Sequence, residues 1–214
     1  MTNNIVDKFL DLNQPMEINP LRLSTMAILL KGARKMAGRN LMTGEYEMNE
    51  FTDENFEENL LTYLQFTSLI NYLIFLEQIG ALFKPKNSTS NLDDSNEIYH
   101  ALYHFSDLNK IQRKAIKSLR NTLTHKFSLA TEIKGKHSYR FSLSLEKDES
   151  VVIPKAWNGI HSNKSDSDLT TIYVHNLIEL IESIYKKVFS LWQKNNLDLR
   201  ISLDELKSRF TIIQ

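Results

Sequence analysis

The amino-acid sequence predicts a mainly α-helical protein, and three observations support that prediction. The chain of 214 residues contains only 6 glycines and 4 prolines, whereas turn-rich β folds use more of both. Apolar residues recur at helical spacing over most of its length. Hydrophobic residues make up 42% of the chain, which is enough for a buried core. We therefore expect residues 1–214 to form one helical domain.

Charge and cysteine content exclude several classes of function. The 26 basic and 26 acidic residues cancel, so net charge predicts no polyanionic partner and only local patterning can. The absence of cysteine excludes disulfides, cysteine nucleophiles and thiolate metal sites. Residues 1–11 lack the features of a secretory signal, and polar residues interrupt the most apolar stretch, residues 60–76. We expect a cytoplasmic protein with no membrane partner.

The first half of the chain is predicted to form three helices, at residues 3–13, 20–38 and 53–80. Asn19 reads as the N-cap of the second helix, with Pro20 at its first position. The second half of the third helix is apolar on nearly all sides, which predicts either a central core helix or a dimer interface. The acidic residues between positions 45 and 58 form either a solvated, dipole-matched face or a surface that pairs with basic residues.

Residues 84–96 are polar and predict a loop, and residues 97–105 predict a short helix. His100 and His104 lie four residues apart within it, which is the spacing of two metal ligands on one helical face. The sequence marks no third ligand and no glutamate between them. We therefore expect surface or packing histidines and no bound metal.

A basic amphipathic helix is predicted to begin at Ser106-Asp107. Its solvent side carries only basic charges, and no acidic residue occurs between Asp107 and Glu132. Such a stripe suits an RNA phosphate backbone, although a solvated lysine face is the alternative. The candidate RNA-binding residues are Lys110, Arg113, Lys114, Lys117 and Lys126.

The remaining chain predicts a β element followed by two helices. Residues 138–145 alternate strictly between apolar and polar, and residues 151–153 can return as a second strand. We expect a small β-hairpin over about 138–153, inserted between helices. Ser167 or Asp168 is expected to cap a long helix that reaches residue 192, and residues 202–205 read as a capping box that opens a last helix.

The candidate site is formed by Arg120, Asn121 and His125 near the end of the basic helix. At about 100° per residue, all three lie off the apolar face, and Asn121 and His125 are surface neighbours. A histidine can accept or donate a proton near neutral pH, and an arginine carries a permanent charge on a planar fork of donors. The sequence Arg120-Asn121-Thr122-Leu123-Thr124-His125 resembles the motif of the HEPN superfamily of helical ribonucleases, an arginine, a polar neighbour and a histidine.

The resemblance implies a HEPN-like up-and-down helical bundle in which the amino-terminal helices and the hairpin are additions. It also implies a metal-independent RNA endonuclease that needs no cofactor and uses the 2′-hydroxyl of RNA as nucleophile. Arg120 would stabilise the phosphorane, His125 would transfer a proton, and Asn121 would orient the histidine or hold a phosphate oxygen. The implied assembly is a homodimer with a composite active site. The implied role is that of a toxin or antiviral-defence effector, restrained by an inhibitory partner protein.

Two other functions remain open at this point. A HEPN-like chain can be a non-catalytic module for RNA binding or protein interaction, in which Arg120 and His125 contact the helix end or a neighbouring acid. A metallohydrolase built on His100 and His104 is the third hypothesis, and resistance of the activity to chelators would argue against it.

Overall fold

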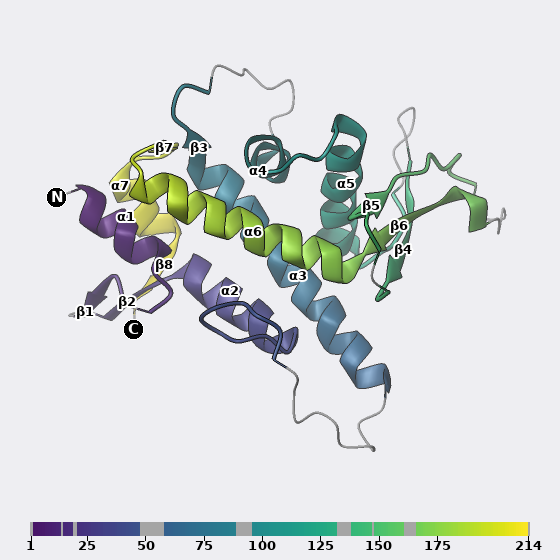
Figure 1. Ribbon diagram of the computed structural model, residues 1–214, viewed down its shortest axis with the longest axis horizontal. Helices are drawn as coiled ribbons and strands as arrows, with labels where there is room; N and C mark the ends of the chain where they lie inside the picture. Colours follow the sequence, from purple (N-terminus) through teal and green to yellow (C-terminus); the bar gives the residue numbers. More distant parts are fainter. Residues whose placement is uncertain are drawn as a thin grey trace.

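The computed structural model describes residues 2–13, 15–18, 21–47, 58–88, 96–131, 138–146, 148–160 and 166–213. Helices dominate it, which confirms the prediction of a mainly α-helical protein (Figure 1). They are α1 (Thr2–Leu10), α2 (Thr25–Met36), α3 (Glu58–Leu82), α4 (Glu97–Phe105), α5 (Lys110–Lys126), α6 (Val174–Gln193) and α7 (Leu203–Arg209), with a 3-10 turn at Asp166–Asp168. Within the described ranges, none of these helices combines the length and apolarity needed to cross a membrane.

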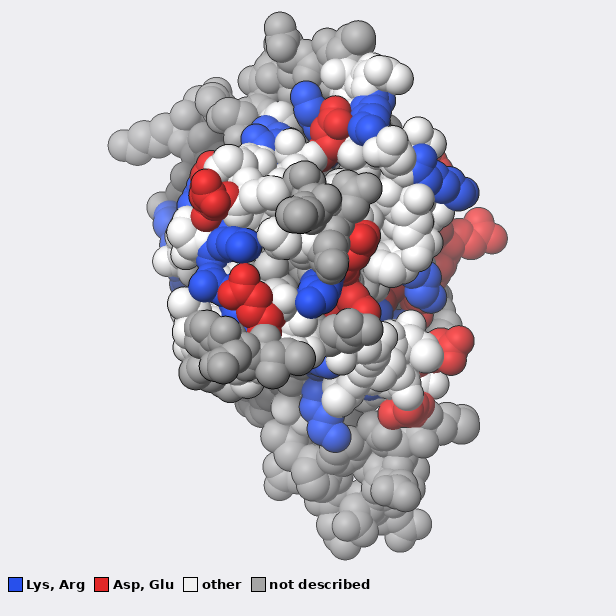
Figure 2. Space-filling view, turned by 90° about the vertical axis from the view of Figure 1, so that its left-hand side faces the viewer, with Lys and Arg blue, Asp and Glu red and all other residues white. Residues whose placement is uncertain are grey.

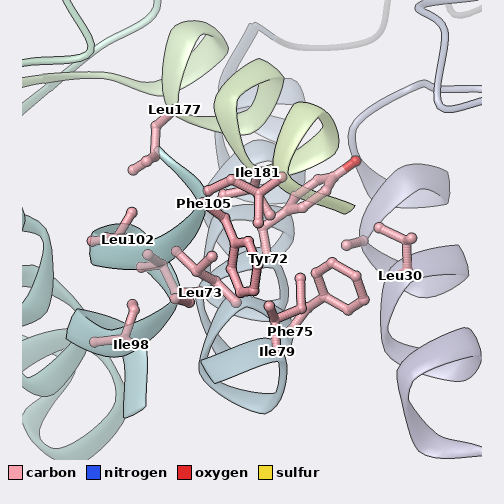
Figure 3. Close-up of a cluster of buried hydrophobic side chains, with 14 of the residues drawn as sticks. Leu30, Tyr72, Leu73, Phe75, Ile79, Ile98, Leu102, Phe105, Leu177 and Ile181 are labelled. Carbon is pink, nitrogen blue, oxygen red and sulfur yellow. The ribbon is translucent and has the colours of Figure 1, made fainter. Parts of the chain in front are cut away.

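Helix α3 is a central core helix, which is one of the two alternatives that its apolar sequence left open. It packs against α2, α4, α5 and α6. Tyr72, Leu73 and Phe75 are fully buried, and Figure 3 shows the α3 side chains between Leu30 of α2 on one side and those of α4 and α6 on the other. Burial on several sides removes the need for a polar stripe, which explains why the second half of this helix is apolar on nearly all sides.

The backbones of α3 and α4 touch at Gly80. A Cβ atom at this position would lie 1.8 Å from the carbonyl oxygen of Glu97 and 2.9 Å from the backbone nitrogen of Ala101. Only glycine permits so close a crossing. Because the short segment Ser106–Asn109 joins α4 to α5, this crossing also decides how α5 lies against α3.

Three small sheets complete the structure. The first has the antiparallel order β1 (Glu17–Ile18), β2 (Leu21–Ser24), β8 (Thr211–Ile213), and it brings residues 21–24 beside residues 211–213 near the carboxyl terminus (Figure 1). The second pairs β3 (Phe83–Pro85) with β7 (Leu197–Leu199), and the third has the order β4 (Arg140–Ser144), β6 (Leu169–Tyr173), β5 (Val152–Ile153).

The predicted β-hairpin over 138–153 is wrong. Strands β4 and β5 do form, but β6 lies between them, parallel to β4 and antiparallel to β5. The long helix predicted from Ser167 or Asp168 therefore begins only at Val174. Thr170 and Ile172 are buried in alternation with half-buried neighbours, and β-branched residues favour strands. A central strand satisfies the hydrogen-bonding groups of two neighbours, which a helix here would leave unpaired.

Pairing with distant strands also moved other predicted boundaries. The helix predicted at 20–38 begins at Thr25, because residues 21–24 pair with β8. Lys84, predicted to lie in a loop, belongs to β3 and pairs with Asp198 of β7. The predicted cap Asn19 lies outside the described residues, and so does the start of the helix predicted at 53–80.

Candidate active site

Helix α5 carries the candidate site on its last two turns. It begins later than predicted, because the cap is Asn109 instead of Ser106-Asp107. The Asn109 side chain accepts hydrogen bonds from the backbone nitrogens of Ile111 and Gln112, and the Gln112 side chain accepts one from the backbone nitrogen of Asn109. The helix ends at Lys126, where Phe127 adopts a left-handed conformation with φ of 47°.

The three predicted catalytic side chains come together in the structure. Nη1 of Arg120 donates a hydrogen bond of 3.0 Å to Oδ1 of Asn121, and it lies 3.3 Å from Nε2 of His125. Arginine can only donate, so this second contact requires an unprotonated Nε2 as acceptor. Arg120 therefore reaches around the helix to join the two neighbours that the spacing had placed on its other side.

A fourth side chain, Glu77 of α3, was missed by the sequence reasoning. Nη2 of Arg120 donates to Oε2 of Glu77 in an ion pair, and the two side chains keep 14% and 22% of their surface exposed. The sequence held one signal for this residue. Glu77 is the only charged residue between Asn59 and Phe83, a segment whose other polar residues are all uncharged. A buried or half-buried charge in such a helix needs a partner.

The expected RNA-binding residues fall into two groups. Lys110, Lys114 and Lys126 are exposed on α5, and Lys117 is half-buried. Arg113 differs from the expectation, because it turns towards α4, where its guanidinium lies 5.1 Å from the ring centroid of Tyr103. It also donates to the carbonyl oxygen of Leu108.

The end of the molecule that lies at the left in Figure 1 shows no surface among its described residues that carries basic charges alone. Figure 2 shows this end face-on, with basic and acidic side chains intermingled. Opposite charges at short range largely cancel each other's field. The described residues of this face are therefore not a candidate contact surface for a polyanion.

His100 and His104 lie side by side on α4, with ring centroids 6.2 Å apart. His104 is half-buried, and Nδ1 lies 3.5 Å from Oγ of Ser88. Burial, with smaller contributions from the positive charges of His100, Arg200 and Lys84, lowers the pKa of His104 to about 4. No cluster of three or more metal-ligating side chains occurs in the part of the chain that the structure describes.

The arrangement around Arg120 combines three chemical capacities. The guanidinium carries a permanent charge, and its Nε is buried without a hydrogen-bond partner among the described residues. The exposed imidazole of His125 can transfer a proton, and the carboxylate of Glu77 can accept one. Comparison of the chain with protein-family models, curated proteins and solved structures finds no similar protein. The interpretation of the site therefore depends on its geometry and on the motif itself.

Proposed function

We propose that this protein is a metal-independent RNA endonuclease. The observation that supports the proposal best is that one arginine, Arg120, contacts both Asn121 and His125 at an accessible helix end. In this function Arg120 binds the scissile phosphate and stabilises the charge of the phosphorane. His125 transfers a proton, and Asn121 holds Arg120 in place through its amide oxygen. The 2′-hydroxyl of the RNA is the nucleophile, and no metal or cofactor takes part.

The proposed enzyme belongs to the HEPN-like up-and-down helical bundles and works as a homodimer in which two copies of the motif face one cleft. The exposed lysines Lys110, Lys114 and Lys126, together with Lys117, contact the RNA backbone. Its proposed role is that of a toxin or antiviral effector, held in check by an inhibitory partner protein. These proposals come from the resemblance of the motif to that superfamily.

The test compares the wild-type chain with Arg120→Ala and His125→Ala on total RNA in the presence of EDTA. We expect the wild type to cleave RNA and to leave 2′,3′-cyclic phosphate and 5′-hydroxyl ends. Each variant should lose about 10²–10⁴-fold in rate, because each removes a group that acts in the transition state. Equal background cleavage in all three proteins would contradict the proposal, and so would activity that EDTA abolishes.

A second candidate function is a non-catalytic RNA-binding or protein-interaction module. The ion pair between Arg120 and Glu77 favours it, because an arginine that serves only to join α5 to α3 would form the same contact. Arg120→Lys separates the two roles of Arg120. Lysine keeps one charge for the ion pair but cannot present a planar fork to a phosphate. An enzyme should therefore lose cleavage in this variant while staying folded, whereas a non-catalytic module cleaves no RNA in the wild type or in the variant.

A further inference from the structure

The proposed reaction needs two proton-transfer groups, and His125 supplies only one. A base must take the proton of the 2′-hydroxyl, and an acid must give a proton to the departing 5′ oxygen on the opposite side of the phosphorus. We propose that Glu77 is the second group, so that a single protomer carries both. This inference rests on the proposed ribonuclease function and changes the role of a dimer, because a second copy would position RNA without completing the chemistry.

One guanidinium links the two groups. Arg120 donates from Nη2 to Oε2 of Glu77, and its Nη1 lies 3.3 Å from Nε2 of His125. Two hydrogen bonds and the guanidinium between them keep the carboxylate and the imidazole within about 8 Å of each other. The attacking 2′ oxygen and the departing 5′ oxygen lie on opposite sides of the phosphorus. An acid and a base that each form a hydrogen bond with one of these oxygens can be up to about 9 Å apart. The spacing therefore suits one phosphodiester placed against Arg120.

Glu77 also has the capacity to take a proton. Its ion pair uses Oε2 alone, and Oε1 makes no hydrogen bond with any described residue. The side chain keeps 22% of its surface exposed, so that oxygen is accessible from solvent. A carboxylate oxygen with free lone pairs, next to a bound phosphate, is what removal of a hydroxyl proton requires.

The proposed step transfers two protons, one from the 2′-hydroxyl and one to the 5′ oxygen. The 2′ oxygen bonds to phosphorus while the bond from phosphorus to the 5′ oxygen breaks, leaving a 2′,3′-cyclic phosphate and a free 5′-hydroxyl. The proton of the 2′-hydroxyl moves to Oε1 of Glu77, and the 5′ oxygen takes a proton from the imidazolium of His125. An imidazolium cannot accept from Arg120, so the RNA phosphate replaces His125 as the acceptor for Nη1.

A substrate with a better leaving group separates the two roles. The probe is an RNA oligonucleotide in which sulfur replaces the 5′ leaving oxygen at a bond that the wild-type chain cuts. A thiolate departs without being protonated, so the acid becomes dispensable. We expect His125→Ala to lose about 10²–10⁴-fold on ordinary RNA and to recover most of that loss on the sulfur substrate. Glu77→Gln should be slowed by a similar factor on both substrates.

Two variants distinguish a base from a residue that only positions Arg120. Glu77→Gln keeps an oxygen that accepts from Arg120 but cannot take a proton, whereas Glu77→Ala removes both capacities. We expect the two variants to be similarly slow. If Glu77→Gln cleaves within about tenfold of wild type while Glu77→Ala is far slower, the carboxylate only positions Arg120 and the proposal is overturned. Recovery of Glu77→Gln on the sulfur substrate would overturn it too, because Glu77 would then be the acid.

The matched control is Glu205→Gln, which alters another glutamate paired with an arginine, on α7. It should cleave both substrates like the wild type. A mixture of His125→Ala and Glu77→Gln proteins should stay as slow as either one, since no protomer in it carries both groups. Recovery in the mixture would show that the two groups meet across a dimer and would overturn the single-protomer assignment. A wild-type chain that cleaves no RNA would instead contradict the ribonuclease function itself.

Discussion

At the scale of single residues, the strongest polar contact in the core joins helices α2 and α6. Nε and Nη2 of Arg34 donate to the two carboxylate oxygens of Glu182, at 2.8 and 2.6 Å, and the side chains are 1% and 3% exposed. The hydroxyl of Tyr72 donates to the same carboxylate at 2.7 Å, and burial, followed by the charge of Glu182, raises the pKa of that hydroxyl. The remaining Nη1 of Arg34 holds the loop at Leu41 and Met42. The network is fully satisfied, so removing either Arg34 or Glu182 leaves the other charge buried without its ion-pair partner.

We therefore predict that Arg34→Met lowers the free energy of unfolding by about 3–5 kcal/mol, because Glu182 remains buried without its partner. Urea denaturation at pH 7 measures the change. The control is Arg209→Met, which breaks an exposed pair with Glu205 and should cost less than about 1 kcal/mol. A loss of similar size in both variants would mean that the buried Arg34–Glu182 pair contributes no more to stability than an exposed ion pair does.

The pKa of His104 predicts how stability depends on pH. In the unfolded chain a histidine takes up a proton near pH 6.5, whereas burial lowers the pKa of His104 in the folded chain to about 4. The unfolded state therefore binds more protons between these values, and stability falls as the pH decreases from about 6.5 to 4. The neighbours His100, Arg200 and Lys84 act in the same direction.

The urea midpoint of the wild type should be lower at pH 5 than at pH 7. We expect this difference between the two midpoints to be smaller in His104→Leu. Replacement of the exposed His125 by alanine is the control and should keep the wild-type difference between the two pH values. An unchanged difference in His104→Leu would place the pH-sensitive group elsewhere.

At the scale of elements, the contact between α3 and α4 positions the site. The crossing at Gly80 lies three residues after Glu77, and α5 follows α4 directly. Gly80→Ala would force the two backbones apart, and overpacking of this kind costs about 1–3 kcal/mol or more. We expect the variant to be destabilised by at least that amount and to lose cleavage activity, because Glu77 moves away from Arg120.

Gly32 of α2 provides the matched control for this substitution. No atom lies within 4 Å of a Cβ placed there, so Gly32→Ala should stabilise the protein by about 0.5–1 kcal/mol through better helix propensity. Thermal unfolding of the two variants should shift in opposite directions. A Gly80→Ala protein as stable as the wild type would show that the close crossing does not limit residue size at Gly80.

At the scale of the whole molecule, one continuous apolar core runs from α1 to α7. It includes Val6 near the start of the chain, Phe141 and Ile172 in the sheet of β4 and β6, and Leu206 near the end. Elements that share one core bury their apolar side chains against each other, so each depends on the others for its stability. This favours cooperative unfolding.

The two tryptophans test this cooperativity, because they report on different regions. Trp157 is buried beside Ser138 next to β4, whereas Trp192 of α6 donates through Nε1 to Asp7 of α1 at 2.6 Å. We predict that single-tryptophan variants Trp157→Phe and Trp192→Phe give coincident urea transitions by fluorescence and by circular dichroism. Two separate midpoints would mean that the sheet region and the amino-terminal region unfold independently.

The sequence by itself determined the features that depend on neighbours a few residues apart. The helical class, the bounds of α4 and the end of α5 follow from local periodicity and capping, because these interactions lie within one or two turns. The meeting of Arg120, Asn121 and His125 is of the same kind, since the three share the last turns of one helix.

Only the tertiary structure decided which distant segments meet. Glu77 lies 43 residues from Arg120, and Glu182 lies 148 residues from Arg34, so no local pattern connects either pair. Strands β2 and β6 read as parts of helices because a short run of apolar and β-branched residues fits both structures. Hydrogen bonding to a distant strand decided that these segments form strands. The intrinsic preference of a few residues for helix or strand contributes little free energy, whereas leaving the backbone groups of a buried strand edge unpaired would cost much more.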